Sequence, residues 1–268
     1  MKTALYYYSA TGNSLAFSKQ IARELGNTRL LPLAKFRKGT KTDAERVGIL
    51  FPIYAWGPPR TVDEFLQNVD LSEAQYVFAV ASCGGTSGNT LPRIRKTLRR
   101  KGSDLDAGFV VASKGYLNLS KPGKKKSPQE KMVDTVRRLS GPRPATDQER
   151  LSEILETLHL GKTVKPEHGK FWGAALGSFF HDMAKPMLAK SDTGFSVTEA
   201  CTDCGICARV CPRENLSLAT GRPVWNHDCD SCGACASWCP ERAILTGGNI
   251  SATRQHHAEV ALPDFLLR

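Results

Sequence analysis

The sequence predicts an α/β protein with a doubly wound, parallel five-stranded sheet of order 2-1-3-4-5, followed by a small cysteine-rich domain. Two observations support this prediction. In the first 113 residues, short apolar runs alternate with amphipathic stretches of helical period. Farther along, eight of the nine cysteines fall within residues 201–239. At 268 residues, the chain has room for about two domains.

The alternation of strands and helices indicates successive βαβ units, whose helices cover both faces of a parallel sheet. The strands are expected at Thr3–Tyr8, Arg29–Leu33, Val47–Ile53, Tyr76–Ser82 and Phe109–Ser113. The helices between them are expected at Ser14–Leu25, Thr61–Val69 and Asn89–Lys101. Gly26 directly follows the first helix, where glycine is a common stop signal.

The middle of the chain has a weaker pattern. Helices are expected at Gln129–Leu139, Thr146–Leu158 and Phe171–Leu188, and loops at Lys121–Lys126 and Lys165–Gly169. The last of these helices is apolar enough to lie on a membrane surface, but it has few cations, so we favour packing between two domains. We therefore divide the chain into a sheet domain at 1–120, a helical connection at 121–190 and a cysteine-rich domain at 191–268, with the boundary near 189–195.

The net charge of +11 is unevenly distributed. Residues 191–248 hold four Lys or Arg and seven Asp or Glu, a net charge of −3, which leaves +14 for the rest. Opposite charges favour docking of the two domains, and a basic surface attracts acidic partner proteins, although it can equally be a solvated surface. No apolar run is long enough to span a bilayer and no signal-peptide pattern is seen, so we expect a cytoplasmic protein.

The clustered cysteines form two copies of one motif, 28 residues apart. Each copy reads Cys-x2-Cys-x2-Cys-x3-Cys-Pro, the bacterial pattern for [4Fe–4S] clusters, in which the fourth cysteine of one copy ligates the other cluster. One cluster is therefore expected on Cys201, Cys204, Cys207 and Cys239, and the other on Cys211, Cys229, Cys232 and Cys235. A pair of zinc sites is the alternative, but zinc sites typically use two separated Cys-x2-Cys units.

Three loops follow the carboxyl ends of the expected strands one, three and four, where open α/β sheets bind ligands. The loop at 9–14 carries hydroxyls and amides at a helix N-terminus, which suits an anion, although an ordinary helix cap is the alternative. The loop at 52–60 carries two aromatic rings that could stack on a planar ligand or pack on the surface. The loop at 82–89 has glycines that allow close approach of a ligand to the backbone.

The candidate binding residues in these loops are Ser9, Thr11, Gly12, Asn13, Ser14, Pro52, Tyr54, Ala55, Trp56, Gly57, Ser82, Cys83, Gly84, Gly85 and Gly88. Cys83 stands apart from the other cysteines, and no His or Lys beside it in sequence would lower the pKa of its thiol, so its role stays open.

The three loops, the cysteine motifs and the segment Gly221–Trp225 resemble a family of bacterial and archaeal proteins that fuse a flavodoxin-like domain to a ferredoxin domain. The resemblance covers both ends of the chain, and residues 120–190 match only in general character. It implies a flavodoxin-like sheet that binds FMN and a bacterial-type ferredoxin domain with two [4Fe–4S] clusters. Residues 115–118 depart from a family loop that approaches the flavin, so only Asn118 is a candidate there.

These features predict an electron-transfer protein that passes low-potential electrons between two [4Fe–4S] clusters and FMN and serves a redox partner protein. A fully thiolate-ligated cluster leaves no open position for substrate, and the chain has no GxGxxG motif for a nicotinamide, so we predict no catalytic residue. The alternative is an FMN-dependent reductase of a quinone or enone. Nucleic-acid binding is disfavoured because the basic stretches lack stacking aromatics. A homodimer stays open, since it could bring distant cofactors together.

Overall fold

The structure is a computed structural model that describes residues 1–113, 145–169, 171–218, 221–246, 250–251 and 256–266. The candidate Asn118, the expected loop at 121–126 and the expected helix at 129–139 lie outside the described residues.

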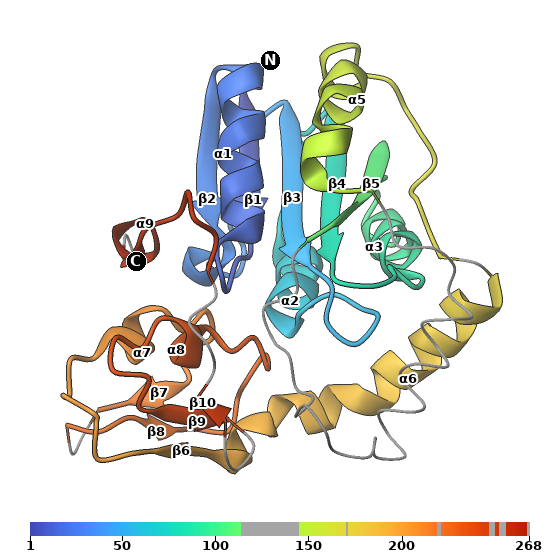
Figure 1. The fold of residues 1–268 in the computed structure, drawn as a ribbon. Coiled ribbons are helices and arrows are strands. Elements are labelled where there is room, and N and C mark those ends of the chain that lie inside the picture. Colours follow the sequence, from blue (N-terminus) through green and yellow to red (C-terminus); the bar gives the residue numbers. More distant parts are fainter. Residues whose placement is uncertain (114–144, 170, 219–220, 247–249, 252–255, 267–268) are drawn as a thin grey trace.

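The amino-terminal half folds around one parallel sheet (Figure 1). Its strands are β1 (Thr3–Tyr7), β2 (Thr28–Pro32), β3 (Arg46–Pro52), β4 (Tyr76–Cys83) and β5 (Ala107–Ala112). They pair in the order β2-β1-β3-β4-β5, and every pair is parallel. The predicted order 2-1-3-4-5 is therefore confirmed, and the carboxyl ends of the five strands lie at one edge.

Helices cover both faces of this sheet. On one face, α1 (Asn13–Leu25) and α5 (Asp147–His159) share a core with the strands, and α2 (Arg60–Asn68) and α3 (Thr90–Arg99) pack on the other face. The Thr146 side chain begins α5 with a capping box that it forms with Glu149. The sequence placed α5 in the connecting region, and in the structure it contacts α1 and β5.

The long helix α6 (Phe171–Ala189) runs along the carboxyl edge of the sheet toward the cysteine-rich lobe (Figure 1). One side of α6 contacts the sheet domain, and Lys185 forms an ion pair with Asp63 of α2. The opposite side exposes the large apolar side chains of Phe179, Met183 and Met187. Among the described helices, none is long and apolar enough to cross a membrane.

The cysteine-rich lobe consists of two similar halves (Figure 1). Its elements are the 3-10 turn η2 (Ser191–Gly194), the short helices α7 (Ile206–Arg209) and α8 (Ala234–Ser237), a sheet of β6 (Phe195–Val197), β9 (Ile244–Thr246) and β10 (Ile250–Ser251), and the hairpin of β7 (Leu216–Ser217) and β8 (Val224–Trp225).

The repeat of the sequence is also a repeat of the backbone conformation. Three pairs of residues at the 28-residue spacing have positive φ: Asp203 and Ser231, Gly205 and Gly233, and Glu214 and Arg242. In each half, the glycine is the N-cap of the short helix that carries the third cysteine. A left-handed backbone there suits glycine, which has no Cβ to clash.

After the cysteine-rich lobe, the chain returns to the sheet domain. The helix α9 (Leu262–Leu266) lies beside the lower ends of α1 and β2 (Figure 1). Val260 and Phe265 are buried in the same core as Leu15 and Ala16 of α1, and Lys19 forms an ion pair with Asp264 at 2.7 Å. A second 3-10 turn, η1 (Leu33–Lys35), follows β2.

Candidate flavin and iron–sulfur sites

The eight clustered thiols lie in two groups of four. Burial, with smaller contributions from the nearby thiols of Cys204, Cys239 and Cys201, raises the pKa of Cys207 to about 11. Cys239, the last cysteine of the second motif, thus lies with the first three cysteines of the first motif. The structure brings together the set that the sequence predicted for one cluster.

The second group likewise takes its fourth cysteine from the other motif. Burial raises the pKa of Cys232 and of Cys235, and in both cases the thiols of Cys211 and Cys229 raise it further. Cys211, the last cysteine of the first motif, therefore lies with the second motif. Buried thiols resist ionisation, but a metal ion that binds the thiolate supplies the compensating charge.

The donor groups fit iron–sulfur clusters. A pocket is lined by all four thiols of the first group and by apolar side chains that include Leu218, Pro223 and Ile244. Backbone N–H groups of Ala243, Asn215 and Ser231 donate to the sulfurs of Cys239, Cys211 and Cys229 at 3.3, 3.4 and 3.1 Å. Such bonds stabilise negative charge on the sulfurs and tune the reduction potential of a cluster.

None of the nine cysteines, all of which are described, forms a disulfide. Among the described residues, no three His, Cys, Asp or Glu side chains are placed to share a single metal ion.

The two groups of thiols differ in their surroundings. Cys204 is exposed, whereas Cys232, at the equivalent position of the second motif, is only 7% exposed. Cys232 lies beside Tyr8 and Tyr54, which stand at the carboxyl ends of β1 and β3. Burial raises the pKa of both tyrosines, and the charges of Asp230 and Cys232 raise it further. The second group of thiols therefore faces the ligand-binding edge of the sheet.

The interface between the lobes has an apolar centre. Val210, Cys232, Ala234 and Trp238 belong to the same buried cluster as the sheet-domain residues Tyr8, Ala10, Leu15 and Ala16. The Trp238 indole N–H donates to the carbonyl oxygen of Ala10 at 2.8 Å. Removing such apolar surface from water stabilises by roughly 25 cal/mol per Å², so the lobes dock as parts of one core.

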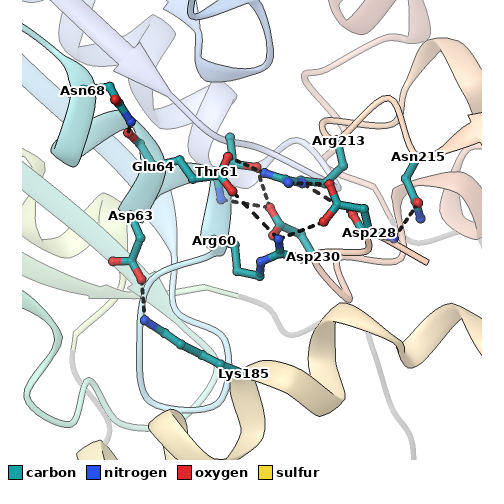
Figure 2. A network of polar contacts seen from close by, with 10 residues as sticks. All are labelled: Arg60, Thr61, Asp63, Glu64, Asn68, Lys185, Arg213, Asn215, Asp228 and Asp230. Carbon is teal, nitrogen blue, oxygen red and sulfur yellow. Dashed lines mark hydrogen bonds and ion pairs between the residues drawn. The ribbon is translucent and has the colours of Figure 1, made fainter. Parts of the chain in front are cut away.

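Beside this centre, a polar network joins α2 to the cysteine-rich lobe (Figure 2). The Thr61 hydroxyl donates to Asp230 at 2.6 Å, Arg60 pairs with Asp228 at 2.8 Å, and Arg213 pairs with Glu64 at 2.6 Å. In the pair of Arg60 and Asp228, the cation lies on the sheet domain, as the net charges of the two domains predict. In the pair of Arg213 and Glu64, the cation lies on the cysteine-rich lobe. Docking therefore depends on individual ion pairs and not on net charge alone.

The first loop, residues 9–14, is held from outside by the carboxyl-terminal part of the chain. Gly12 begins α1 with φ of 102° and has no side chain to cap the helix, and the Ser9 hydroxyl accepts from the Leu15 N–H of the first turn at 3.4 Å. The backbone N–H of His257 donates to the carbonyl oxygen of Thr11 at 2.8 Å, and a Cβ on Gly12 would lie 3.0 Å from the Cβ of His257. The amide groups of a helix N-terminus attract anions. The geometry therefore suits the predicted phosphate loop.

The second loop contains a strained turn. Tyr54 and Gly57 exchange backbone hydrogen bonds of 2.8 and 3.0 Å, and the residues between them, Ala55 and Trp56, have φ of 45° and 63°. Positive φ at two successive positions is typical of a type I′ turn, which favours Asn and Gly. For other residues this conformation costs about 1–2 kcal/mol each, so contacts outside the turn must maintain it.

The Trp56 side chain of this turn lies against the third loop and α6. A Cβ on Gly88 would lie 3.2 Å from the Cβ of Trp56, and a Cβ on Gly177 of α6 would lie 3.0 Å from its ring. The Trp56 and Phe180 rings are 6.4 Å apart. Tyr54 instead points toward Tyr8, with ring centroids 6.2 Å apart. The structure thus separates the two predicted aromatic residues, and stacking on a flavin remains a prediction for each.

The third loop carries unsatisfied polar atoms. Ser82 lies at the end of β4, and within the described part of the chain the buried hydroxyls of Ser82 and Thr86 have no hydrogen-bond partner. Buried hydroxyls are rarely left unpaired, and a polar ligand at the carboxyl edge would satisfy them. Cys83 is also buried, as the last residue of β4. The polar groups of this edge therefore fit a flavin.

Comparison with known proteins gives a match for the cysteine-rich lobe. Residues 200–244 match the family described as the 4Fe-4S dicluster domain. The chain thus joins a sheet with the flavodoxin-like strand order to a segment that matches the 4Fe-4S dicluster domain. Among curated proteins, none matches this sequence.

Solved structures of low identity resemble the flavodoxin-like part. A flavodoxin from the domain Archaea is 16% identical, with a TM-score of 0.34, over 42% of this chain and 85% of its own. A flavoprotein in complex with FMN from Lactobacillus acidophilus is 12% identical, with a TM-score of 0.31, over 41% of this chain and 92% of its own. A short-chain flavodoxin associated with a PDU bacterial microcompartment is 17% identical, with a TM-score of 0.38, over 60% and 99%. These scores are low, and the fold assignment rests on the strand order of the sheet.

Several residues of this region were not predicted from the sequence. Trp238 occupies the position that Val210 has in the first motif. This aromatic residue, which breaks the repeat, was the signal by which the sequence could have marked it. His181 is buried in α6 against the Ala55 carbonyl, and His257 lies on the first loop. Their partners are more than 120 positions away in sequence, and no local pattern marks either histidine.

Proposed function

We propose that this chain transfers electrons between two [4Fe–4S] clusters, held by its eight clustered cysteines, and an FMN held at the carboxyl edge of its sheet. The 4Fe-4S dicluster match and the flavodoxin-like sheet support an electron-transfer role. The clusters would supply single-electron chemistry, and a flavin takes one or two electrons.

The position of Cys232 beside Tyr8 and Tyr54 carries this proposal. Cys232 belongs to the second group of thiols, and the two tyrosines stand where β1 and β3 end. A cluster on this group would therefore lie against the edge that is expected to hold the flavin. The contact forms within one chain, so it does not depend on a second copy.

The surrounding residues would hold the cofactors and exclude water. The amides of residues 9–14 would bind the FMN phosphate, and the hydroxyls of Ser82 and Thr86 would bind polar atoms of the flavin. Trp238 and His257 fix the carbonyl oxygens of Ala10 and Thr11 and so orient the peptide planes of the first loop. The apolar lobe interface would shield the path between the two cofactors.

The first test is the cofactor content of protein purified without oxygen. We expect about eight irons and eight sulfides per chain, the sum of two four-iron clusters, together with one FMN. Eight irons without flavin would leave a ferredoxin with a docking domain and would contradict the flavin half of the proposal. A redox partner protein and a cytoplasmic location remain predictions.

A matched pair of variants tests the path. Cys204 and Cys232 are equivalent in the two motifs, but only Cys232 faces the sheet. We expect either change to Ala to remove one cluster. Cys232→Ala should also slow flavin reduction by a cluster-directed donor much more than Cys204→Ala does. Equal rates of flavin reduction in the two variants would contradict the path through the second group.

A further inference from the structure

The strained turn at Ala55 and Trp56 is held by a histidine from α6. The Nδ1 atom of His181 lies 3.1 Å from the carbonyl oxygen of Ala55. A carbonyl oxygen only accepts, so Nδ1 carries the proton and donates. A second donor lies on α3, where the Thr90 hydroxyl is shared between the Ser87 carbonyl at 2.7 Å and the Trp56 carbonyl at 3.1 Å. Both carbonyl oxygens of the strained residues thus have a side-chain donor.

The imidazole packs directly on the glycine that closes the turn. A Cβ on Gly57 would lie 2.3–2.4 Å from three atoms of the His181 ring. No side chain is possible at Gly57 without moving the ring. The position of the His181 ring therefore requires glycine at position 57. The glycine lets α6 approach closely enough for Nδ1 to reach the turn.

His181 is a costly residue if its only role is to pack the helix. It is 1% exposed, and its Nε2 atom has no hydrogen-bond partner among the residues that the structure describes. Burial lowers its pKa and the cations of Lys185 and Arg93 lower it further, while the Ala55 carbonyl and Asp63 oppose this, so the ring is neutral at pH 7. A buried polar atom without a partner destabilises, and an apolar side chain of similar size would pack without this penalty. The hydrogen bond to the turn gives a reason for histidine here.

We propose that His181 is a positioning residue of the flavin site, whose Nδ1–H holds the Ala55–Trp56 turn in its left-handed conformation. This inference rests on the proposed function, in which the flavin binds at this edge. The turn determines where the chain places Tyr54 on one side and Trp56 on the other. The helix α6, which the parallel sheet does not itself require, is then part of the cofactor site.

The test compares three variants in the full chain with its clusters in place. His181→Leu removes both ring nitrogens. His181→Asn keeps an N–H donor near the position of Nδ1. Met183→Ala, on the exposed side of the same helix, is the control. The readouts are the dissociation constant for FMN, measured by fluorescence titration of flavin-depleted protein, and the reduction potential of the bound flavin. Iron content and melting temperature report the fold.

We expect His181→Leu to weaken FMN binding by roughly fivefold, the loss of about one net hydrogen bond, and to shift the flavin potential. His181→Asn should restore binding to within about twofold of the wild type, and Met183→Ala should leave both values unchanged. Thr90→Val, which removes the donor shared by the Trp56 and Ser87 carbonyls, should weaken FMN binding in the same direction as His181→Leu. If His181→Leu does not fold, the FMN affinity of Thr90→Val tests whether the hydrogen bonds to the turn support flavin binding.

The outcomes separate the two proposals. Wild-type protein that binds no flavin overturns the proposed function and this inference with it. If the wild type binds FMN and His181→Leu has the same FMN affinity and flavin potential, only the proposed role of His181 is overturned. The role of His181 is also overturned if His181→Asn melts like the wild type yet binds FMN as weakly as His181→Leu.

Discussion

Replacing Thr61 with Val should loosen the docking of the two lobes. Thr61 and Asp230 are 8% and 5% exposed, and the Thr61 hydroxyl donates to the Asp230 carboxylate at 2.6 Å (Figure 2). A hydrogen bond to a charged group contributes about 1.5–3 kcal/mol, and valine keeps the shape but not the donor. A loss of about 2 kcal/mol increases the population of separated lobes about 30-fold. Thr61→Ser, which keeps the hydroxyl, is the matched control.

Hydrogen exchange measured by mass spectrometry reports this opening. The backbone N–H of residue 61 donates to the Asp230 carboxylate at 3.4 Å across the docked lobes, so peptides that cover this amide follow the separation. We expect these peptides to exchange about 30-fold faster in Thr61→Val and at the wild-type rate in Thr61→Ser, if exchange requires separation. The same rate in both variants would show that the bond between Thr61 and Asp230 does not hold the lobes together.

Three further changes test other parts of the chain. Gly12→Val should remove FMN and leave the iron content unchanged, because Gly12 has φ of 102° and a side chain there would press on His257; unchanged flavin content would contradict the phosphate loop. Trp238→Phe should lower the free energy of unfolding by about 1–3 kcal/mol, because the Ala10 carbonyl loses its buried donor, and denaturant melts check this. Burial raises the pKa of Tyr76 to about 12, with Asp106 adding to the shift. Since an unfolded tyrosine ionises near pH 10, Tyr76 should contribute about 2 kcal/mol to the stability that the wild type loses as the pH rises from 10 to 12, and Tyr76→Phe should lose that much less than the wild type.

The fold was largely predictable because its signals are local. Apolar runs of strand length and helical periods placed all five strands and the helices α1, α2 and α3 within about two residues of their observed bounds, a usual uncertainty for such ends. The strand order was predicted because five strands at this spacing fit the flavodoxin-type doubly wound sheet. The pairing of Cys211 and Cys239 with the opposite motif followed from the chemistry of two-cluster ferredoxins, and the thiols are grouped in this way.

The contacts between lobes could not be predicted, because their partners are remote in sequence. Thr61 and Asp230 are 169 positions apart, and Ala10 and Trp238 are 228 positions apart. The left-handed turn at Ala55 and Trp56 was also unpredictable, since neither residue favours positive φ. Its cause lies outside the turn, in His181 and Thr90. The sequence predicted that the three loops lie at the carboxyl edge of the sheet, but it contained no signal for the residues that hold them.

The two cysteine motifs show most directly what local sequence leaves undetermined. They share spacing, glycines and positive φ at equivalent positions, and they differ in residues between the cysteines, such as Val210 and Trp238. Yet Cys204 is exposed to solvent, and Cys232 is buried against Tyr8 and Tyr54. Solvent exposure and nearby hydrogen bonds set the potential of a cluster, so lobe docking would make two locally equivalent sites unequal. The difference between the two sites is therefore a property of the interface, and variants such as Thr61→Val that loosen docking should reduce it.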